Sequence, residues 1–451
     1  MVRGKSYQPL RRSSSEGEGV ESLNRGQDSE DRHSGPRRRR PGRRSRWFSR
    51  LALLAAGGLF GLFLAELFLR AYFAWAPVPP DSHFIPDPEA HYRLRPTPAG
   101  AIEDPADHIN AFGFRGREHL REKPPGTYRI LGIGDSFVYG LVPMRANFMT
   151  VAERQANDLL SAGAGPRDTI EVIPMGLPGY SPKNYVGVLR SIGLATDPDL
   201  VVVGFFIDND VIGIPVRGEV LHGELYYVGS STWWLDLLRR LRLWVVAEKV
   251  MRPRVNGGHR QASGREPADG EPLSAGDEPP AGETPTEPVE PTLAYLLYQW
   301  KRLPVYAAAP NEEIEALWKQ AEGSLLEIDR LCARAGIDWI LMLIPAEIQV
   351  DEGVRAAVLR KLERPASVYD FEAPQRRLRE LAANLDVPVL DLLPRFRELY
   401  AGGERLYFPN DTHWNPRGNR VAGEMLAHEL IARAAGAQSA GEAVRSAPLL
   451  P

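Results

Sequence analysis

The sequence predicts an α/β fold: a three-layer α/β/α sandwich around a mostly parallel five-stranded sheet, preceded by one transmembrane helix. Two observations lead to this prediction. From about residue 125, short apolar runs rich in Val, Ile and Leu alternate with helical stretches, which is typical of buried parallel strands joined by helices. Before them, the chain is uncharged over 51–65 and stays apolar as far as Trp75, except at Glu66 and Arg70. Twenty-five helical residues extend about 37 Å, enough to cross a bilayer core of about 30 Å.

Five runs are expected to form the sheet in a flavodoxin-like arrangement, in which ligands bind beyond the carboxyl ends of the strands. These runs are "TYRILGIG", "TIEVIP", "DLVVVGFF", "IDWILMLIP" and "VPVLDLL". The helical stretches lie at 145–162, 182–194, 311–335, 372–385 and 416–435. The one cysteine, Cys332, falls in the third of these stretches and is expected to be a buried structural thiol.

Residues 1–46 are rich in Ser, Gly and Arg and nearly free of apolar residues, so they are predicted to be a disordered basic tail. Residues 1–50 contain fourteen Lys and Arg against six Asp and Glu, and the rest of the chain is acidic. The run "RRRRPGRRSR" would suit a nucleic-acid-binding arm, but the apolar stretch that follows favours a membrane-proximal tail. No nucleic-acid partner is therefore expected.

Residues 47–76 are predicted to be a single-pass anchor in the inner (cytoplasmic) membrane. Eight Arg and no acid lie at 37–50, whereas three acids and no Lys or Arg lie at 76–90. The positive-inside rule then places the tail in the cytoplasm and the remainder in the periplasm. Glu66 and Arg70 are four residues apart and could form an ion pair within the helix. "AWA" at 74–76 resembles a signal-peptidase site, but an n-region of about fifty residues favours an uncleaved anchor.

Beyond the anchor, 77–124 is Pro-rich and predicted to be an irregular stalk and N-terminal extension. The α/β domain is expected at 125–436, with an insertion at 211–310 that contains a disordered linker at 252–292. The aromatic shoulders of that linker, "STWWLDLLRRLRLWVV" and "TLAYLLYQWKRLPVY", either complete the core or cap a site. Residues 437–451 are expected to be a disordered tail.

Two strand ends carry a nucleophile and glycines. The first run ends in "GDS", which places Ser136 at the start of a helix, with Asp135 expected to cap that helix. The second continues as "PMGLPGYS", where Gly176 and Gly179 are expected to let the backbone approach a ligand closely. Taken alone, "GDS" is also an ordinary capped turn.

Two further stretches supply an amide, a base and an acid. "FIDND" places Asn209 just past the third strand, and "YFPNDTHWNPRGN" places Asp411 and His413 in a loop before a helix. Acyl transfer by a serine needs a base, an acid that orients the base, and donors for the oxyanion. Asp208 and Asp210 flank Asn209 and leave a cation site open as a minor alternative. No metal or other cofactor is expected.

With these blocks in order, residues 108–435 resemble the SGNH (GDSL-type) hydrolase superfamily. The resemblance implies that Ser136 is the nucleophile, His413 the base and Asp411 its orienting acid. It also implies an oxyanion hole formed by the backbone N–H groups of Ser136 and Gly179 and by the side chain of Asn209. "NAFGFRG" and "IPAEIQV" are similar to segments of membrane-anchored members. Residues 134–138 read GDSFV, which does not fit the G-x-S-x-G elbow of α/β-hydrolases.

The chain departs from the SGNH pattern at three places. Pro174 replaces the usual Asn of the second block, Ile207 replaces the Gly of the third, and Thr412 alone separates acid from base. The resulting Asp-x-His-Trp motif is similar to that of alginate-type O-acetylation proteins, in which, however, the motif precedes the serine. The pattern therefore leaves hydrolase and transferase open.

These features predict a membrane-anchored serine esterase that removes O-acetyl groups from envelope or exported polysaccharide. An acylated carbohydrate is the expected substrate, and a polysaccharide-export or acyl-donor membrane protein is a possible partner. Two alternatives stay open: an O-acyltransferase that acetylates an exported polysaccharide, and a non-catalytic glycan-binding module.

Overall fold

The computed structural model describes residues 43–75, 82–97, 107–161, 169–213, 217–221, 224–228, 238, 241–251 and 290–446. The chain divides into two units, Met1–Leu62 and Phe63–Pro451. The sheet, the candidate site and every contact described below belong to the second unit.

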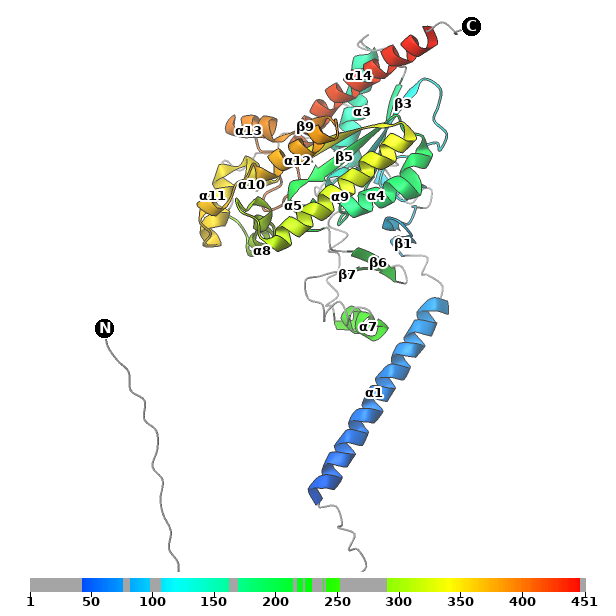
Figure 1. Ribbon diagram of the computed structural model, residues 1–451, viewed down its shortest axis with the longest axis vertical. Helices are drawn as coiled ribbons and strands as arrows, with labels where there is room; N and C mark the ends of the chain where they lie inside the picture. Colours follow the sequence, from blue (N-terminus) through cyan, green and yellow to red (C-terminus); the bar gives the residue numbers. More distant parts are fainter. Residues whose placement is uncertain are drawn as a thin grey trace, which may run out of the picture. The chain divides into compact units, whose positions relative to one another are not determined.

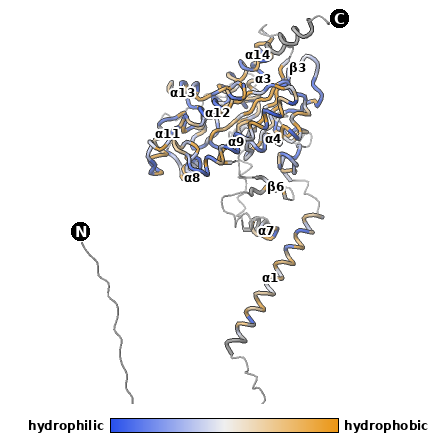
Figure 2. Tube along the Cα trace, in the orientation of Figure 1, coloured by the Kyte–Doolittle hydropathy of each residue, from blue (hydrophilic) through white to orange (hydrophobic). Residues whose placement is uncertain are grey.

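Helix α1 (Arg43–Trp75) contains the apolar stretch, and its residues Arg50–Trp75 are long and apolar enough to cross a membrane, with a mean hydropathy of 2.1. The apolar character continues along most of the helix (Figure 2). The expectation of disorder through residue 46 is wrong at 43–46, because the helix begins directly after the helix-breaking pair Pro41–Gly42. Residues 1–42 of the expected tail lie outside the described part of the chain.

Glu66 is held by three groups from two helices. Its carboxylate pairs with Arg70 at 2.7 Å, as their spacing suggests. It also accepts hydrogen bonds of 3.0 Å from the backbone N–H groups of Arg242 and Leu243, the first residues of α7 (Arg242–Met251). A carboxylate at the first turn of a helix satisfies free N–H groups and complements the helix dipole. Glu66 therefore caps α7.

The central sheet has five parallel strands in the order β4-β3-β5-β8-β9, which confirms the predicted class. Its central strands are buried on both faces, which explains their nearly continuous apolar sequence. Because all five strands run the same way, their carboxyl ends meet at one edge. The strands are β3 (Thr127–Gly134), β4 (Thr169–Gly176), β5 (Leu200–Phe206), β8 (Asp338–Ile344) and β9 (Val389–Asp391).

Helices cover both faces of the sheet (Figure 1). Helices α3 (Phe148–Leu159) and α14 (Pro416–Ser446) pack together on one side, and α4 (Pro182–Val188) packs with α9 (Glu312–Ala335) on the other. Cys332 is buried in α9, where burial raises the pKa of its thiol to about 12. Helix α12 (Ala373–Asn384) lies beside β9.

Several elements appear where irregular structure or a tail was expected. Residues 82–97, part of the expected irregular stalk, form an antiparallel hairpin of β1 (Phe84–Asp87) and β2 (His91–Leu94) that buries Tyr92. Helix α14 continues to Ser446, so the expected disordered tail is wrong over 437–446, a stretch rich in the good helix formers Ala, Gln, Glu and Arg. Residues 447–451 lie outside the described part.

The insertion is partly described. Its second shoulder forms α8 (Leu293–Arg302) and the turn η6 (Leu303–Tyr306), and buries Tyr295, Leu303, Val305 and Tyr306 in the core. The linker expected at 252–292 is described only at 290–292, where Thr292 caps α8 by accepting from the backbone N–H of Tyr295. The remaining elements are α2 (Ser136–Tyr139), α5 (Ile207–Asp210), β6 (Arg217–Leu221), β7 (Glu224–Val228), α10 (Glu347–Val350), α11 (Glu352–Lys361) and α13 (Leu393–Ala401).

Candidate active site

Ser136 stands at the carboxyl edge of the sheet, at the first position of the one-turn helix α2. Asp135 is its N-cap: the Asp135 side chain accepts a 3.0 Å hydrogen bond from the backbone N–H of Phe137. Cap and nucleophile are therefore neighbours in one short turn that follows β3 directly. "GDS" is a capped turn and also the turn that presents Ser136.

Two glycines allow α2 to sit on the sheet. Gly134 and Gly176 are paired in register at the ends of β3 and β4. A Cβ on Gly134 would lie 2.4 Å from the Val138 side chain, and one on Gly176 would lie 2.5 Å from it. Neither distance is tolerable for carbon atoms, so any side chain here would displace α2. Gly176 therefore makes room for the nucleophile's helix, and its expected role in ligand approach stays a prediction.

His413 joins Ser136 to Asp411. Its Nε2 lies 2.8 Å from Ser136 Oγ, and its Nδ1 lies 2.6 Å from Asp411 Oδ1. The same carboxylate oxygen also accepts the backbone N–H of His413 at 3.0 Å. Burial raises the pKa of Asp411, but the hydrogen bonds and charge of His413 outweigh it and lower this pKa below its usual value. Asp411 is therefore a carboxylate at neutral pH, as the orienting acid of such a triad must be.

Aromatic packing fixes the loop that carries His413. Trp414 is buried and meets the Phe137 ring edge-on at 4.7 Å between centroids. The Phe137 ring also lies 5.1 Å from the His413 imidazole. The residue after the nucleophile thus packs against both the base and the tryptophan that follows it, which explains why the Asp-x-His motif continues with Trp.

The predicted oxyanion donors lie around the loop after β4. Gly179 has φ = +81°, a conformation that favours glycine. Among the described residues, no protein acceptor receives a hydrogen bond from the backbone N–H of Gly179 or of Ser136. The Asn209 amide nitrogen reaches both the Asp135 carboxylate and the Tyr180 carbonyl at 3.3 Å. Both bonds are long, so an oxyanion could replace the bond to Tyr180 at little cost.

The β1–β2 hairpin supports this loop, a contact that the sequence analysis did not anticipate. The Tyr92 hydroxyl donates to the Pro178 carbonyl at 2.9 Å, and the Tyr180 hydroxyl donates back to the Tyr92 carbonyl. The Asn184 side chain donates to the Ala90 carbonyl at 3.1 Å. Residues between α1 and the central sheet therefore position the loop that holds Gly179.

Asp208 and Asp210 are turned to different partners. Asp208 accepts from the Tyr306 hydroxyl, and Asp210 accepts from the Tyr185 hydroxyl at 2.8 Å. Both are fully buried, and burial raises the pKa of Asp208 to about 6 and that of Asp210 well above its usual value. Within the described ranges, no group of three or more His, Cys, Asp and Glu side chains could hold a metal ion.

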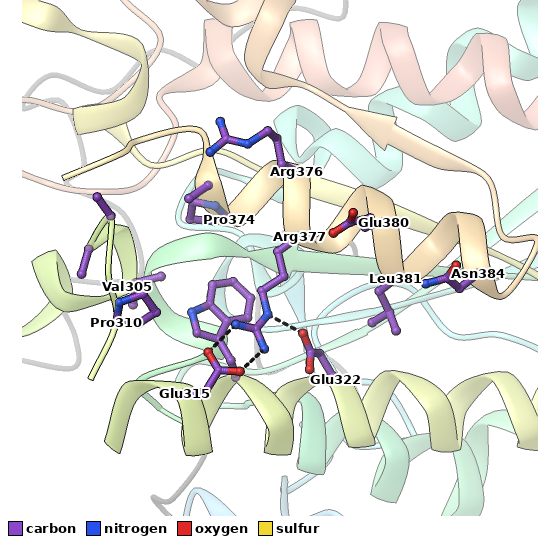
Figure 3. A pocket seen from close by; sticks show the side chains of 14 residues that line it. Val305, Pro310, Glu315, Glu322, Pro374, Arg376, Arg377, Glu380, Leu381 and Asn384 are labelled. Atoms are coloured by element: carbon purple, nitrogen blue, oxygen red, sulfur yellow. Dashed lines mark hydrogen bonds and ion pairs between the residues drawn. The ribbon is translucent and has the colours of Figure 1, made fainter. Parts of the chain in front are cut away.

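A groove of about 570 Å³ lies away from these residues, between α9 and α12 (Figure 3). Its centre is occupied by Arg377, which pairs with Glu315 at 2.7 Å and with Glu322. The guanidinium also lies 5.0 Å from the Trp318 ring. The lining includes no predicted site residue, and Arg377, Glu315 and Glu322 at its centre already pair with one another, so we assign the chemistry to the triad and not to this groove.

Asp135 should make the stability of the protein depend on pH. Its carboxyl is fully buried, and burial raises its pKa to about 6 from an ordinary 3.8. The folded protein therefore binds this proton more tightly than the unfolded chain, so the stabilising contribution is complete below pH 3.8 and is lost as the pH rises through 6. Asp135→Asn keeps the cap and removes the titration. In full-length protein in detergent, the variant should gain Tm relative to wild type at pH 7.5 and lose that gain at pH 4.5; parallel pH curves would contradict the assignment.

The fold is an α/β/α sandwich with a hydrogen-bonded Ser–His–Asp series at the carboxyl edge of its parallel sheet, and its C-terminal third is similar to a known family of such domains. Residues 302–450 match the family model described as an SGNH hydrolase-like domain of the acetyltransferase AlgX, which confirms the resemblance drawn from the motifs. The matched region contains Asp411 and His413 but not Ser136, Gly179 or Asn209.

The chain is also similar to several solved structures of low sequence identity. An acetyl xylan esterase is 12% identical with a TM-score of 0.36, covering 67% of this chain and all of its own. A lipase/acylhydrolase from Enterococcus faecalis is 14% identical with a TM-score of 0.33, covering 68% and 96%. An acetyl-xylooligosaccharide esterase from Geobacillus is 11% identical with a TM-score of 0.34, covering 67% and 94%. No curated protein matches the chain.

Proposed function

We propose that this protein is a membrane-anchored serine esterase that removes O-acetyl groups from polysaccharide outside the cytoplasm. The observation that supports it most directly is the continuous hydrogen-bonded series Ser136–His413–Asp411 at the carboxyl edge of the sheet. A serine beside an oriented imidazole is the arrangement that nucleophilic acyl transfer needs.

In the proposed reaction, Ser136 Oγ attacks the carbonyl carbon of the acetyl ester while His413 Nε2 takes the hydroxyl proton. The Asp411 carboxylate stabilises the imidazolium, and the N–H groups of Ser136 and Gly179 with the Asn209 amide bind the oxyanion. When the tetrahedral intermediate collapses, the carbon–oxygen bond to the sugar breaks and His413 gives its proton to the departing alcohol. Water, deprotonated by His413, then attacks the acetyl-serine and releases acetate.

A second candidate function is an O-acetyltransferase, because the family model matched by residues 302–450 carries that description. The two functions share the first half-reaction and differ in whether water or a sugar hydroxyl takes the acetyl group. With p-nitrophenyl acetate as donor and methyl glycosides as acceptors, mass spectrometry separates them: an esterase yields acetate, and a transferase yields acetylated glycoside.

The experiment that tests the proposal uses the full-length chain in detergent. A fluorophosphonate should label Ser136, and p-nitrophenyl acetate should be hydrolysed. Ser136→Ala should lose both activities, whereas Ser324→Ala, which changes a mostly buried serine of α9, should lose neither. Wild-type protein with no labelling and no turnover would refute the enzyme and favour a glycan-binding module.

The proposed location rests on the Arg excess before Leu51 and on the length of α1. A periplasmic reporter fused after Pro451 should be active, and protease added to spheroplasts should digest the domain. Replacing the eight Arg of 37–50 with Gln should weaken this orientation. A reporter active only in the cytoplasm would contradict both the topology and an envelope substrate.

A further inference from the structure

A cluster of buried polar side chains lies beside the triad and is only partly hydrogen-bonded. Asp208 and Gln299 are fully buried. Within the described part of the chain, Asp208 Oδ2, both polar atoms of the Gln299 amide and Arg302 Nε have no hydrogen-bond partner. Gln299 and Arg302 are three residues apart on α8, and the charge of Arg302 acts on the Asp208 carboxyl. A buried polar group without a partner costs about 1–3 kcal/mol, so these four atoms point to a ligand that completes them.

The cluster borders the triad from two directions. Asp208 directly precedes Asn209 on α5. On the other side, Tyr298 of α8 lies near Thr412, the residue between Asp411 and His413: the Thr412 side chain partly offsets the rise that burial causes in the pKa of Tyr298. A group bound by this cluster would therefore lie next to the acyl group on Ser136.

The partly exposed side chains of Tyr298 and Arg302 lie over the buried side chain of Gln299. The Arg302 guanidinium lies 3.4 Å from the centre of the Tyr298 ring, and Arg302 Nη1 donates to the Tyr298 carbonyl at 3.3 Å. Both side chains are partly open to solvent, unlike Gln299 beneath. Helix α8 also packs through one face only, since Leu293 and Trp300 on its other face are 73% and 50% exposed. A ligand can thus reach the cluster by displacing the stacked pair.

The chemistry of the four atoms selects the kind of ligand. Asp208 offers an acceptor with negative charge, Arg302 a donor with positive charge, and Gln299 one donor and one acceptor. An anion would be repelled by Asp208 and a cation by Arg302. An apolar acyl chain would leave all four atoms unpaired. Hydroxyl groups both donate and accept, so neighbouring hydroxyls on one ring can satisfy the whole set.

We propose that Asp208, Gln299, Tyr298 and Arg302 form the subsite that holds the hydroxyl-bearing sugar ring of the ester substrate. This inference rests on the proposed function and adds the residues that select the alcohol part of the ester. Most of α8 precedes the region matched by the AlgX-type family model, which begins at residue 302. The subsite therefore depends on this chain's insertion.

The test compares three acetylated sugars with the acetate ester of a carbocyclic ring that carries no hydroxyls. Acetate release is measured for 6-O-acetylated glucose, mannose and galactose, and for cyclohexylmethyl acetate. Wild-type protein should prefer at least one sugar ester by kcat/KM. Gln299→Leu should reduce that preference at least tenfold and should not lower Tm, because it removes unpaired buried atoms. Gln375→Leu changes another buried glutamine whose nitrogen has no partner among the described residues; its oxygen accepts from Gln349 rather than from any residue of the proposed subsite, so the preference should stay unchanged.

A wild-type protein with no preference for any sugar ester, or a Gln299→Leu variant that keeps the preference, would overturn the subsite. Saturation-transfer NMR with the methyl glycosides of the same three sugars gives a second readout that needs no catalysis. Binding should be lost in Gln299→Leu and kept in Gln375→Leu. Sugar binding without Ser136 labelling would refute the esterase but support the subsite. Ser136 labelling without sugar binding would support the esterase but refute the subsite.

Discussion

Asp411→Asn should lower kcat for p-nitrophenyl acetate about 10⁴-fold, the size of effect known for this substitution in a serine triad. The asparagine oxygen can still accept the backbone N–H of His413, so the loop should keep its shape. What is lost is the carboxylate 2.6 Å from Nδ1, which stabilises the imidazolium and selects the imidazole tautomer. Because the defect is electrostatic, Tm should change little.

The matched control for this variant is Asp370→Asn. Asp370 is also ion-paired, with Arg376, but is half-buried and lies outside the triad. Its kcat should equal that of wild type. Stopped-flow and steady-state kinetics over pH 6–9 would measure both. A loss of less than tenfold in Asp411→Asn would mean that His413 is oriented by another group, and the triad would have to be reassigned.

Asn209→Ala should lower kcat about 10²- to 10³-fold, the range for the loss of one oxyanion donor. Fluorophosphonate labelling of Ser136 should persist at a reduced rate, because nucleophile and base are untouched. The variant also removes the 3.3 Å bond to Asp135 and leaves that buried carboxylate with fewer donors. Some loss of Tm at pH 7.5 is therefore expected with the loss of rate.

Asn157→Ala is the control that separates a loss of kcat from a loss of Tm. Asn157 bonds the backbone of Ile170 through both its oxygen and its nitrogen, each at 2.8 Å, and so ties α3 to β4. This variant should lose Tm but keep kcat in the folded fraction. If Asn209→Ala behaved in the same way, Asn209 would be a structural residue and the oxyanion hole would consist of backbone groups alone.

The parallel sheet was predictable because each strand is buried on both faces and therefore leaves an apolar run in the sequence. The position of Ser136 was predictable because its motif coincides with the end of β3, and that of His413 because its motif lies in the loop before a predicted helix. That Gly176 makes room for Val138 was not predictable, because the sequence does not reveal which side chain packs onto it. The proposed subsite under α8 was missed for a similar reason: Gln299 and Arg302 read as the polar face of a surface helix until packing places Gln299 against the core.

The hairpin at 82–97 was missed because prolines flank its short strands and mask their pattern. Its contacts with the Gly179 loop change where the catalytic unit begins. A soluble fragment trimmed to residue 125, the expected start of the α/β domain, would lack Tyr92 and Ala90 and leave the loop without its support. A fragment that begins before Ser82 would keep the hairpin. A fragment that begins after Thr97 would lack it and would lose the hydrogen bonds that hold the Gly179 loop. The stretch that reads as an irregular stalk thus supports the loop of the candidate active site.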